Sequence, residues 1–294
     1  MANLNPELPQ NFHDKQVMAQ ARIMAREIRT ELVKAHENAY HSKLQHGAYV
    51  RLLEENEADV KQSMAWLRKC HIDAHTEGVV CGAQELAIIT KYHEKHILKN
   101  SDDDKCRVCK TDPESIFHLL GACDVLAKRE YFTRHNSICQ YLHYKILKHY
   151  QFNVGENWYR HTPTDVLRND QCEVIYDQVI FTTRPVGANR PDIIVKDKKM
   201  KKAFIIDVAC PVDTNVVKKE REKIAKYGGL RGELQRMWGI DAEVVPVIVG
   251  GLGAVTKNLG DKLMTIPGHP DRFMCQKICL LGSKKILLDV LKQR

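Results

Sequence analysis

The sequence lacks a long apolar run. Its most apolar stretches, around 204–212 and 244–249, are far shorter than the ~20 residues that a membrane-spanning helix needs. No apolar leader follows Met1, and the ten cysteines are spaced irregularly in a chain of 294 residues, unlike the cysteine framework of a small secreted protein. We therefore expect a protein with no membrane partner, in a reducing compartment, with mostly free thiols.

A strong excess of one charge is also missing. The formal net charge is +8, which suits contact with a polyanion but does not establish it. The positive charge is concentrated in residues 184–226, which hold twelve Lys or Arg against six Asp or Glu. This local excess favours a polyanionic substrate.

The chain divides by composition into three parts. Residues 1–100 are rich in Ala, Glu, Lys, Gln and Leu and poor in Pro and Gly, which predicts a helical linker region. The polar stretch 99–105 indicates a boundary before residues 101–150, a cysteine-containing segment flanked by helices. Residues 151–294 form the third part, where short β-rich runs begin.

The third part predicts a sheet with helices around it. A helical stretch at 216–238 separates the last two β-rich runs, and another follows from about 270 to 293. This order predicts an α+β fold, in which a small mixed sheet is flanked by helices. The expected strands are Glu173–Thr183, Asp192–Val195, Ala203–Ala209 and Glu243–Val249.

A Cys-Cys-His-Cys pattern opens the middle part. Cys106-x2-Cys109-x8-His118-x4-Cys123 offers three thiolates and an imidazole, enough to close a tetrahedral zinc site. The alternative interpretations are an ordinary cytosolic cysteine cluster or a different fourth ligand. Zinc binding to a small module contributes on the order of 10 kcal/mol, so we expect a structural Zn²⁺ that supplies much of the local folding energy.

Basic side chains are candidates for nucleic-acid contacts. Those beside the Cys-Cys-His-Cys pattern are accompanied at 131–135 by Tyr, Phe and His side chains that can stack on bases. A solvated helix face explains the same residues equally well. The basic candidates in the whole chain are Arg107, Lys110, Arg134, Arg190 and Lys219.

Two aspartates accompany neighbouring apolar strands, one at the start of a strand and one inside the next. Asp192 leads into Ile-Ile-Val, and Asp207 stands among Ile, Val and Ala inside the next expected strand. A carboxylate in such surroundings is costly unless it is paired or bound to a cation. A shared Mg²⁺ held by both aspartates is one interpretation, and an internal salt bridge of Asp207 with a lysine is the other.

The helical stretch after these strands supplies the basic partner. Val216, Glu220, Lys223 and Tyr227 fall along one stripe that also carries leucines, whereas Lys226 aligns with a polar face. We therefore expect Lys223 to be the active-site lysine, which orients water or stabilises charge on a phosphate, with Glu220 as an additional ligand or a group that tunes the lysine.

Taken together, these segments resemble the C-terminal part of non-LTR retrotransposon polyproteins that carry a restriction-like endonuclease. In that family a Cys-Cys-His-Cys knuckle precedes the nuclease, and weaker similarity extends to Trp66–Lys69 and Thr76–Gly78, in the linker. The segments that carry the resemblance are 106–123, 190–192, 206–211, 219–227 and 246–253.

The resemblance implies a PD-(D/E)XK fold and a nuclease that nicks chromosomal DNA to prime reverse transcription. Asp192, Asp207 and Lys223 match the catalytic positions of the family, with Lys226 and Tyr227 close behind. It also implies double-stranded DNA as partner, a nuclear location, structural Zn²⁺ and catalytic Mg²⁺. Element RNA and a reverse transcriptase supplied by another chain are further expected partners.

Two departures from the family pattern leave alternatives open. Ala209 stands where the superfamily usually has its lysine, so the lysine must come from the helix. No polymerase motif is found, so this chain cannot complete retrotransposition alone. A catalytically silent nucleic-acid-binding module is therefore the main alternative, and a purely structural, zinc-stabilised interaction domain is a third.

Overall fold

The computed structural model of the protein describes residues 12–41 and 47–292. The chain forms two compact units, 1–48 and 49–294. The first contains one long helix, α1 (Phe12–His41). Its many Ala, Glu, Arg and Met residues are strong helix formers, and it has no internal Pro or Gly.

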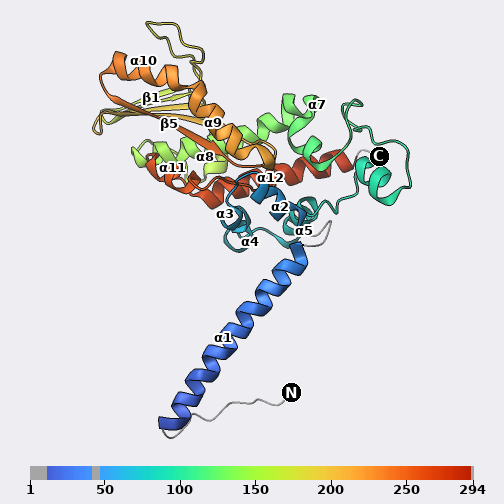
Figure 1. The fold of residues 1–294 in the computed structure, drawn as a ribbon. Coiled ribbons are helices and arrows are strands. Elements are labelled where there is room, and N and C mark those ends of the chain that lie inside the picture. The colour runs from blue at the N-terminus through green and yellow to red at the C-terminus, as the bar shows by residue number, and fades with distance from the viewer. Residues whose placement is uncertain (1–11, 42–46, 293–294) are drawn as a thin grey trace. The chain divides into compact units, whose positions relative to one another are not determined.

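The second unit begins with short helices, as the composition predicted (Figure 1). Aspartate side chains begin two of them, because Asp59 accepts the Gln62 backbone N–H at 2.8 Å and Asp73 accepts the Thr76 N–H at 2.9 Å. Trp66 is 1% exposed and belongs to the hydrophobic core of this unit. The elements are α2 (Ala48–Glu55), α3 (Val60–Met64), α4 (Trp66–Lys69), α5 (Ala74–Gln84), α6 (Lys91–His93) and the π-turn η1 (Glu94–Leu98).

The cysteine-rich segment leads into a long helix that packs on one face of the sheet. It contains two π-turns and a short helix, followed by the eighteen residues of α8. The elements are η2 (His118–Ala122), α7 (Asp124–Leu126), η3 (Ala127–Tyr131) and α8 (Phe132–His149).

Five strands form one mixed sheet in the order β1-β2-β3-β4-β5, preceded by a 3₁₀ turn, η4 (Trp158–Arg160). Neighbouring strands from β1 to β4 are antiparallel, and β5 is parallel to β4. The α+β class is therefore confirmed. The strands are β1 (Val166–Arg168), β2 (Cys172–Tyr176), β3 (Ile193–Asp197), β4 (Lys202–Ala209) and β5 (Asp241–Ile248).

Two details of the sheet differ from the sequence prediction. The strand expected at Glu173–Thr183 ends at Tyr176, because Asp177 adopts a left-handed backbone with φ 48° and the chain leaves the ladder there. The edge strand β1 was not predicted. Its three residues are too few to show an alternating pattern.

A helical connection lets β5 return parallel to β4, as a parallel pair requires. The predicted helix 216–238 is present but divided at Tyr227. The predicted C-terminal helix is α12, and α11 precedes it. The elements are η5 (Asp213–Asn215), α9 (Val216–Lys226), α10 (Gly228–Trp238), α11 (Leu259–Thr265) and α12 (Arg272–Leu291).

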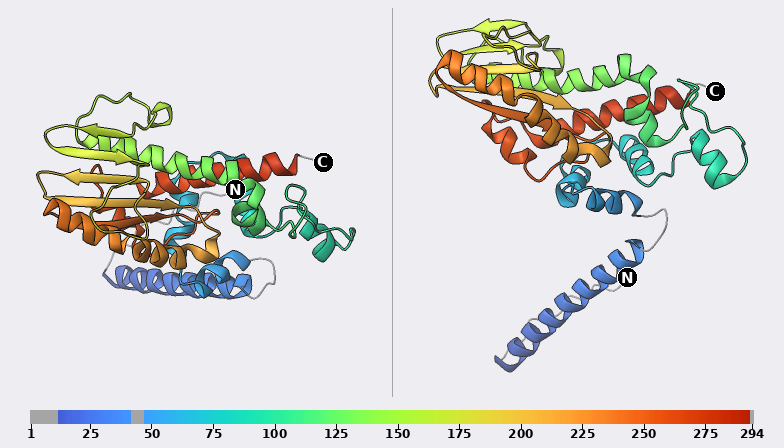
Figure 2. Two further views of the ribbon diagram at one scale, coloured as in Figure 1. Left: turned by 90° about the horizontal axis from the view of Figure 1, so that it is seen from above. Right: turned by 45° about the horizontal axis from the view of Figure 1, so that its top comes forward.

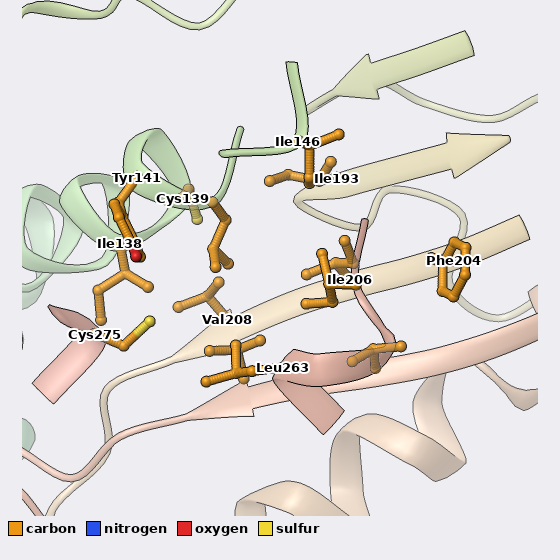
Figure 3. Close-up of a cluster of buried hydrophobic side chains, with 14 of the residues drawn as sticks. Ile138, Cys139, Tyr141, Ile146, Ile193, Phe204, Ile206, Val208, Leu263 and Cys275 are labelled. Carbon is orange, nitrogen blue, oxygen red and sulfur yellow. The ribbon is translucent and has the colours of Figure 1, made fainter. Parts of the chain in front are cut away.

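The two faces of the sheet are covered by different helices. On one face α8 and α12 run side by side (Figure 2). Ile138 and Cys139 of α8 lie near Val208 of β4 and Cys275 of α12, and Ile206 of β4 belongs to the same cluster (Figure 3). On the other face Tyr227, Leu230 and Leu234 pack on Ile194 and Ile205.

Alternation along β4 assigns Asp207 to a face. Phe204, Ile206 and Val208 belong to the α8 face, whereas Ala203 and Ile205 belong to the α9–α10 face. Because successive strand side chains point to opposite faces, Asp207 lies on the α9–α10 face. The side of α9 that carries Lys223 covers that face.

A buried carboxylate fastens the glycine-rich loop after β5. Asp213 accepts hydrogen bonds from the Tyr49 hydroxyl at 2.8 Å and from the backbone N–H groups of Leu252 and Ala254, both at 2.9 Å. The first helix of this unit, the loop and the start of α9 are thereby joined. A Cβ on Gly250 would collide with the Asp213 carboxylate, so the glycine is required.

Among residues 12–41 and 47–292, no helix is both long enough and apolar enough to cross a membrane.

Candidate functional site

The four residues of the Cys-Cys-His-Cys pattern come together in space. The ligand atoms of Cys106, Cys109, His118 and Cys123 all lie within 4.8 Å of one another, and Cys109 Sγ is 3.4 Å from His118 Nε2. The predicted grouping is confirmed, and this arrangement of soft donors can hold a metal ion.

Local backbone geometry forms this metal-ligand cluster. A tight turn brings the first two cysteines together, because the Lys110 N–H donates to the Cys106 carbonyl at 2.8 Å. The Cys123 N–H donates to the His118 carbonyl at 3.0 Å, which is the i→i+5 bond of a π-turn. The Tyr131 hydroxyl also donates to the His118 carbonyl, at 2.9 Å, and fixes this turn from the outside.

Arg107 serves the structure of this segment. Its guanidinium Nε and Nη2 donate to the two carboxylate oxygens of the fully buried Glu114 at 2.8 and 2.7 Å. Burial raises the pKa of Glu114, but the hydrogen bonds from Arg107 outweigh it and keep the pKa below its usual value. The Arg107 guanidinium, a predicted nucleic-acid contact, is thus already bound to Glu114. Lys110, the other predicted contact in this segment, is exposed.

Arg134 does not present a surface to nucleic acid. It is 2% exposed and donates to the carbonyls of Leu120 and Cys210 at 2.7 and 3.0 Å and to the Ser283 hydroxyl at 2.9 Å. Gly282 leaves the space through which the Arg134 side chain passes. The predicted DNA contact is therefore wrong for Arg134, because its charge joins elements inside the fold.

The two predicted aspartates lie at the end of the β3–β4 pairing. The last pair of this antiparallel ladder is Ile193 with Ile206, and Asp192 directly precedes Ile193 while Asp207 directly follows Ile206. Asp192 also caps the end of this pairing, because its Oδ2 accepts the Val208 N–H at 2.6 Å.

The helix α9 brings a lysine to the same point. Lys223 Nζ forms an ion pair with Asp207 Oδ2, and the side chains are 18% and 3% exposed. Asp207 is thus paired internally, as the structural interpretation of this residue required, and its partner is the lysine that the helical stripe predicted.

Tyr227 follows Lys223 by one helical turn and is fully buried beside both carboxylates. Its hydroxyl donates to the Arg190 carbonyl at 3.0 Å. Burial is the main cause that raises the pKa of Tyr227 above its usual value, and the hydrogen bonding and negative charge of Asp207 and the charge of Asp192 add to it. The tyrosine is therefore held neutral, as a hydrogen-bond donor.

The site contains one residue that sequence reasoning treated only as a stacking candidate. His135, on α8, places Nε2 at 3.1 Å from Asp192 Oδ2. Burial lowers the pKa of His135, but hydrogen bonding to Asp192 and Cys139 outweighs it and raises the pKa to about 12. No signal in the sequence connects α8 with the aspartate more than fifty residues later, because only the tertiary fold joins them.

The remaining predicted catalytic residues lie around this site without joining it directly. Glu220 binds the Thr256 hydroxyl and the Lys262 ammonium, so it is engaged away from Lys223. Lys226 is exposed, and its Nζ donates to the Tyr227 hydroxyl at 2.9 Å.

Two predicted basic contacts lie on the surface and are paired with acids. Arg190 Nε and Nη2 donate to the two Asp177 carboxylate oxygens at 2.9 and 3.0 Å, with the arginine side chain 57% exposed. Lys219 donates to Glu222 at 2.6 Å, one turn along α9. Exposed pairs of this kind are weak and exchange readily, so both cations remain available to a phosphate.

Comparison with known proteins adds no assignment: no protein-family model matches the chain, and no curated protein matches it.

Proposed function

We propose that this protein is a magnesium-dependent DNA endonuclease with a restriction-like, PD-(D/E)XK core. The observation that carries the proposal is the juxtaposition of Asp192 and Asp207 by the β3–β4 register, with Lys223 of α9 against Asp207. The order of α8, four antiparallel strands, a helical crossover and a parallel strand also supports this core.

Stability alone is a poor reason for this ion pair. A buried pair costs two desolvations and is often no better than apolar residues of similar size. The surrounding α9–α10 face is otherwise filled by apolar side chains such as Ile205 and Leu230. A lysine and two carboxylates gathered at one end of that face are better explained by chemistry on a charged substrate.

The carboxylates suit a hard divalent cation. Asp207 Oδ2 is buried and forms an ion pair with the Lys223 ammonium. Asp192 uses Oδ2 for its hydrogen bonds with the Val208 N–H and with His135 Nε2. Each carboxylate retains oxygen lone pairs that can bind Mg²⁺, which prefers oxygen ligands and keeps several waters. When bound, Mg²⁺ supplies a nucleophilic water and neutralises phosphate charge.

The chain's own residues then have separate roles. Asp192 and Asp207 hold the cation at the end of the β3–β4 ladder. The Lys223 ammonium, partly exposed beside Asp207, holds a non-bridging oxygen of the scissile phosphate and stabilises the charge that develops there. Tyr227 keeps its proton and, through the Arg190 carbonyl, fixes the loop that enters β3.

The Cys-Cys-His-Cys cluster is proposed to hold structural Zn²⁺. Three thiolates and an imidazole within 4.8 Å of one another fill a tetrahedral shell with no open position. Cys106 and Cys123 are fully buried and pack with Leu119, Ile248 and Leu252 in one hydrophobic cluster. The ion therefore stabilises the junction between this segment and the sheet.

The substrate proposed is double-stranded DNA, and the protein is proposed to act in the nucleus as the nuclease piece of a non-LTR retrotransposon polyprotein. A reverse transcriptase and element RNA would come from another chain. The resemblance of segments 190–192, 206–211 and 219–227 supports this context.

The test is nicking of supercoiled plasmid with and without Mg²⁺. We expect Mg²⁺-dependent conversion to the open circle, lost in Asp207→Asn and retained in Asp289→Asn, which changes an exposed aspartate of α12. Activity in Asp207→Asn would contradict the proposal. A chain that binds DNA with salt-sensitive affinity but never cuts would be the silent binding module instead.

A further inference from the structure

A second group of metal-ligating side chains adjoins the carboxylate pair. His135 and Cys139 lie four residues apart on α8 and therefore share one face of the helix. That face meets Asp192, the residue just before β3. The ligand atoms of His135, Cys139 and Asp192 all lie within 4.8 Å of one another.

The separations lie within about half an ångström of the edges of a metal polyhedron. Cys139 Sγ is 3.8 Å from His135 Nε2, and that nitrogen is 3.1 Å from Asp192 Oδ2. Zinc bonds of about 2.3 Å to sulfur and about 2.0–2.2 Å to nitrogen or oxygen, at tetrahedral angles, put such donors about 3.4–3.6 Å apart. Small side-chain movements suffice to close the site.

The donor set selects the ion. One thiolate, one imidazole and one carboxylate favour a thiophilic divalent ion over Mg²⁺, which is poorly served by sulfur. Cys139 is buried, whereas the His135 and Asp192 side chains are 25% and 20% exposed, so an ion can enter from the carboxylate side. Three protein ligands leave one position for water, as in open zinc sites.

We propose that His135, Cys139 and Asp192 bind Zn²⁺ or a similar thiophilic ion, and that this ion withdraws Asp192 from Asp207 and so inhibits the nuclease. The binding site stands on the geometry alone. The inhibition rests on the proposed function. Zinc would then act on the protein twice, as a structural ion in the Cys-Cys-His-Cys cluster and as an inhibitor at α8.

The first experiment counts zinc without reference to activity. The purified chain is titrated with Zn²⁺ against a chromophoric chelator, and folding of each variant is checked by circular dichroism. We expect two equivalents per chain, one for each group of ligands. Cys139→Ser and His135→Asn should each bind one, and Cys172→Ser, a change at a buried thiol of the same core, should keep two.

One equivalent in the unmutated chain, with the Cys-Cys-His-Cys cluster intact, would overturn the proposal. So would two equivalents in both Cys139→Ser and His135→Asn. Two independent variants protect the test against misfolding of either one.

The second experiment measures nicking in Mg²⁺ with and without added Zn²⁺. The ratio of the two rates should be at least about tenfold in the unmutated chain and close to unity in Cys139→Ser or His135→Asn, because loss of a ligand weakens metal binding. Equal inhibition of all three would refute the inhibitory role. If no chain nicks at all, the nuclease proposal fails while the zinc count still decides the site.

Discussion

The Lys223–Asp207 pair makes a prediction in which stability and activity separate. Lys223→Met leaves the Asp207 carboxylate, which is 3% exposed, without its counter-ion. Removing one partner of a buried pair costs about 3–5 kcal/mol. Since Lys223 is 18% exposed, we expect the lower end of that range, about 3 kcal/mol.

The opposite change should cost less. In Asp207→Asn the flexible Lys223 side chain can turn its ammonium to solvent, whereas a strand carboxylate cannot leave its place. We expect a loss of about 1 kcal/mol, comparable to one hydrogen bond. The double variant should be more stable than the sum of the two losses predicts, with a coupling of about 1–3 kcal/mol.

Nicking should follow a different rule. Both single variants and the double variant should lose activity by about 100-fold or more, because restored stability does not restore the ammonium or the carboxylate. Unfolding free energies come from denaturant titration and rates from plasmid nicking, with Lys218→Met, an exposed lysine of α9, as the matched control. Additive stabilities would refute a direct pair, and nicking by the double variant would refute the catalytic role. Loss of nicking in Asp207→Asn but not in Lys223→Met would transfer the lysine role to Lys226.

Three further predictions follow from other parts of the fold. A chelator should lower the thermal midpoint of the chain by removing a structural ion from the Cys-Cys-His-Cys cluster, and a Cys109→Ser variant should show no further shift; scanning fluorimetry measures both. Tyr49→Phe should cost about 1–3 kcal/mol in denaturant titration, because it removes a donor from buried Asp213; an unchanged midpoint would contradict this. Burial, together with His161, lowers the pKa of His143 from 6.5 to about 3. Below pH 6.5 the unfolded chain therefore binds the extra proton, and stability falls as the pH drops toward 3. Relative to His143→Phe, the unmutated chain should lose about 2 kcal/mol between pH 8 and pH 5.

Much of the fold could be predicted from local pattern. The apolar runs that became β3, β4 and β5 and the helical stripe of α9 are strong local signals, and the structure contains them. The errors have two different causes. The strand expected to run to Thr183 stops where Asp177 turns left-handed, which local pattern does not encode. The break of the helix at Tyr227 is marked by Gly228 and Gly229, a helix-end signal that the continuous stripe across it outweighed in the prediction.

The parts of the site that depend on residues close together in the sequence could be predicted. Spacing alone brings the Cys-Cys-His-Cys ligands together, and helical periodicity alone selects Lys223 over Lys226, because Lys223 shares the inward stripe with Tyr227. The charge pattern wrongly predicted that Arg134 lies on the surface. A basic residue of a helix can be buried when distant carbonyl groups and, here, the Ser283 hydroxyl accept hydrogen bonds from its guanidinium.

The partner of Asp192 shows where sequence reasoning ends and why the structure matters for function. His135 reaches this carboxylate only because α8 crosses the sheet face next to β3, a contact that no periodicity within α8 foretells. The consequence is chemical: Asp192 belongs both to the proposed Mg²⁺ site with Asp207 and to the group of possible ligands formed with His135 and Cys139. One carboxylate would not serve both ions fully, so the metal bound at Asp192 would determine whether the pair of aspartates is complete.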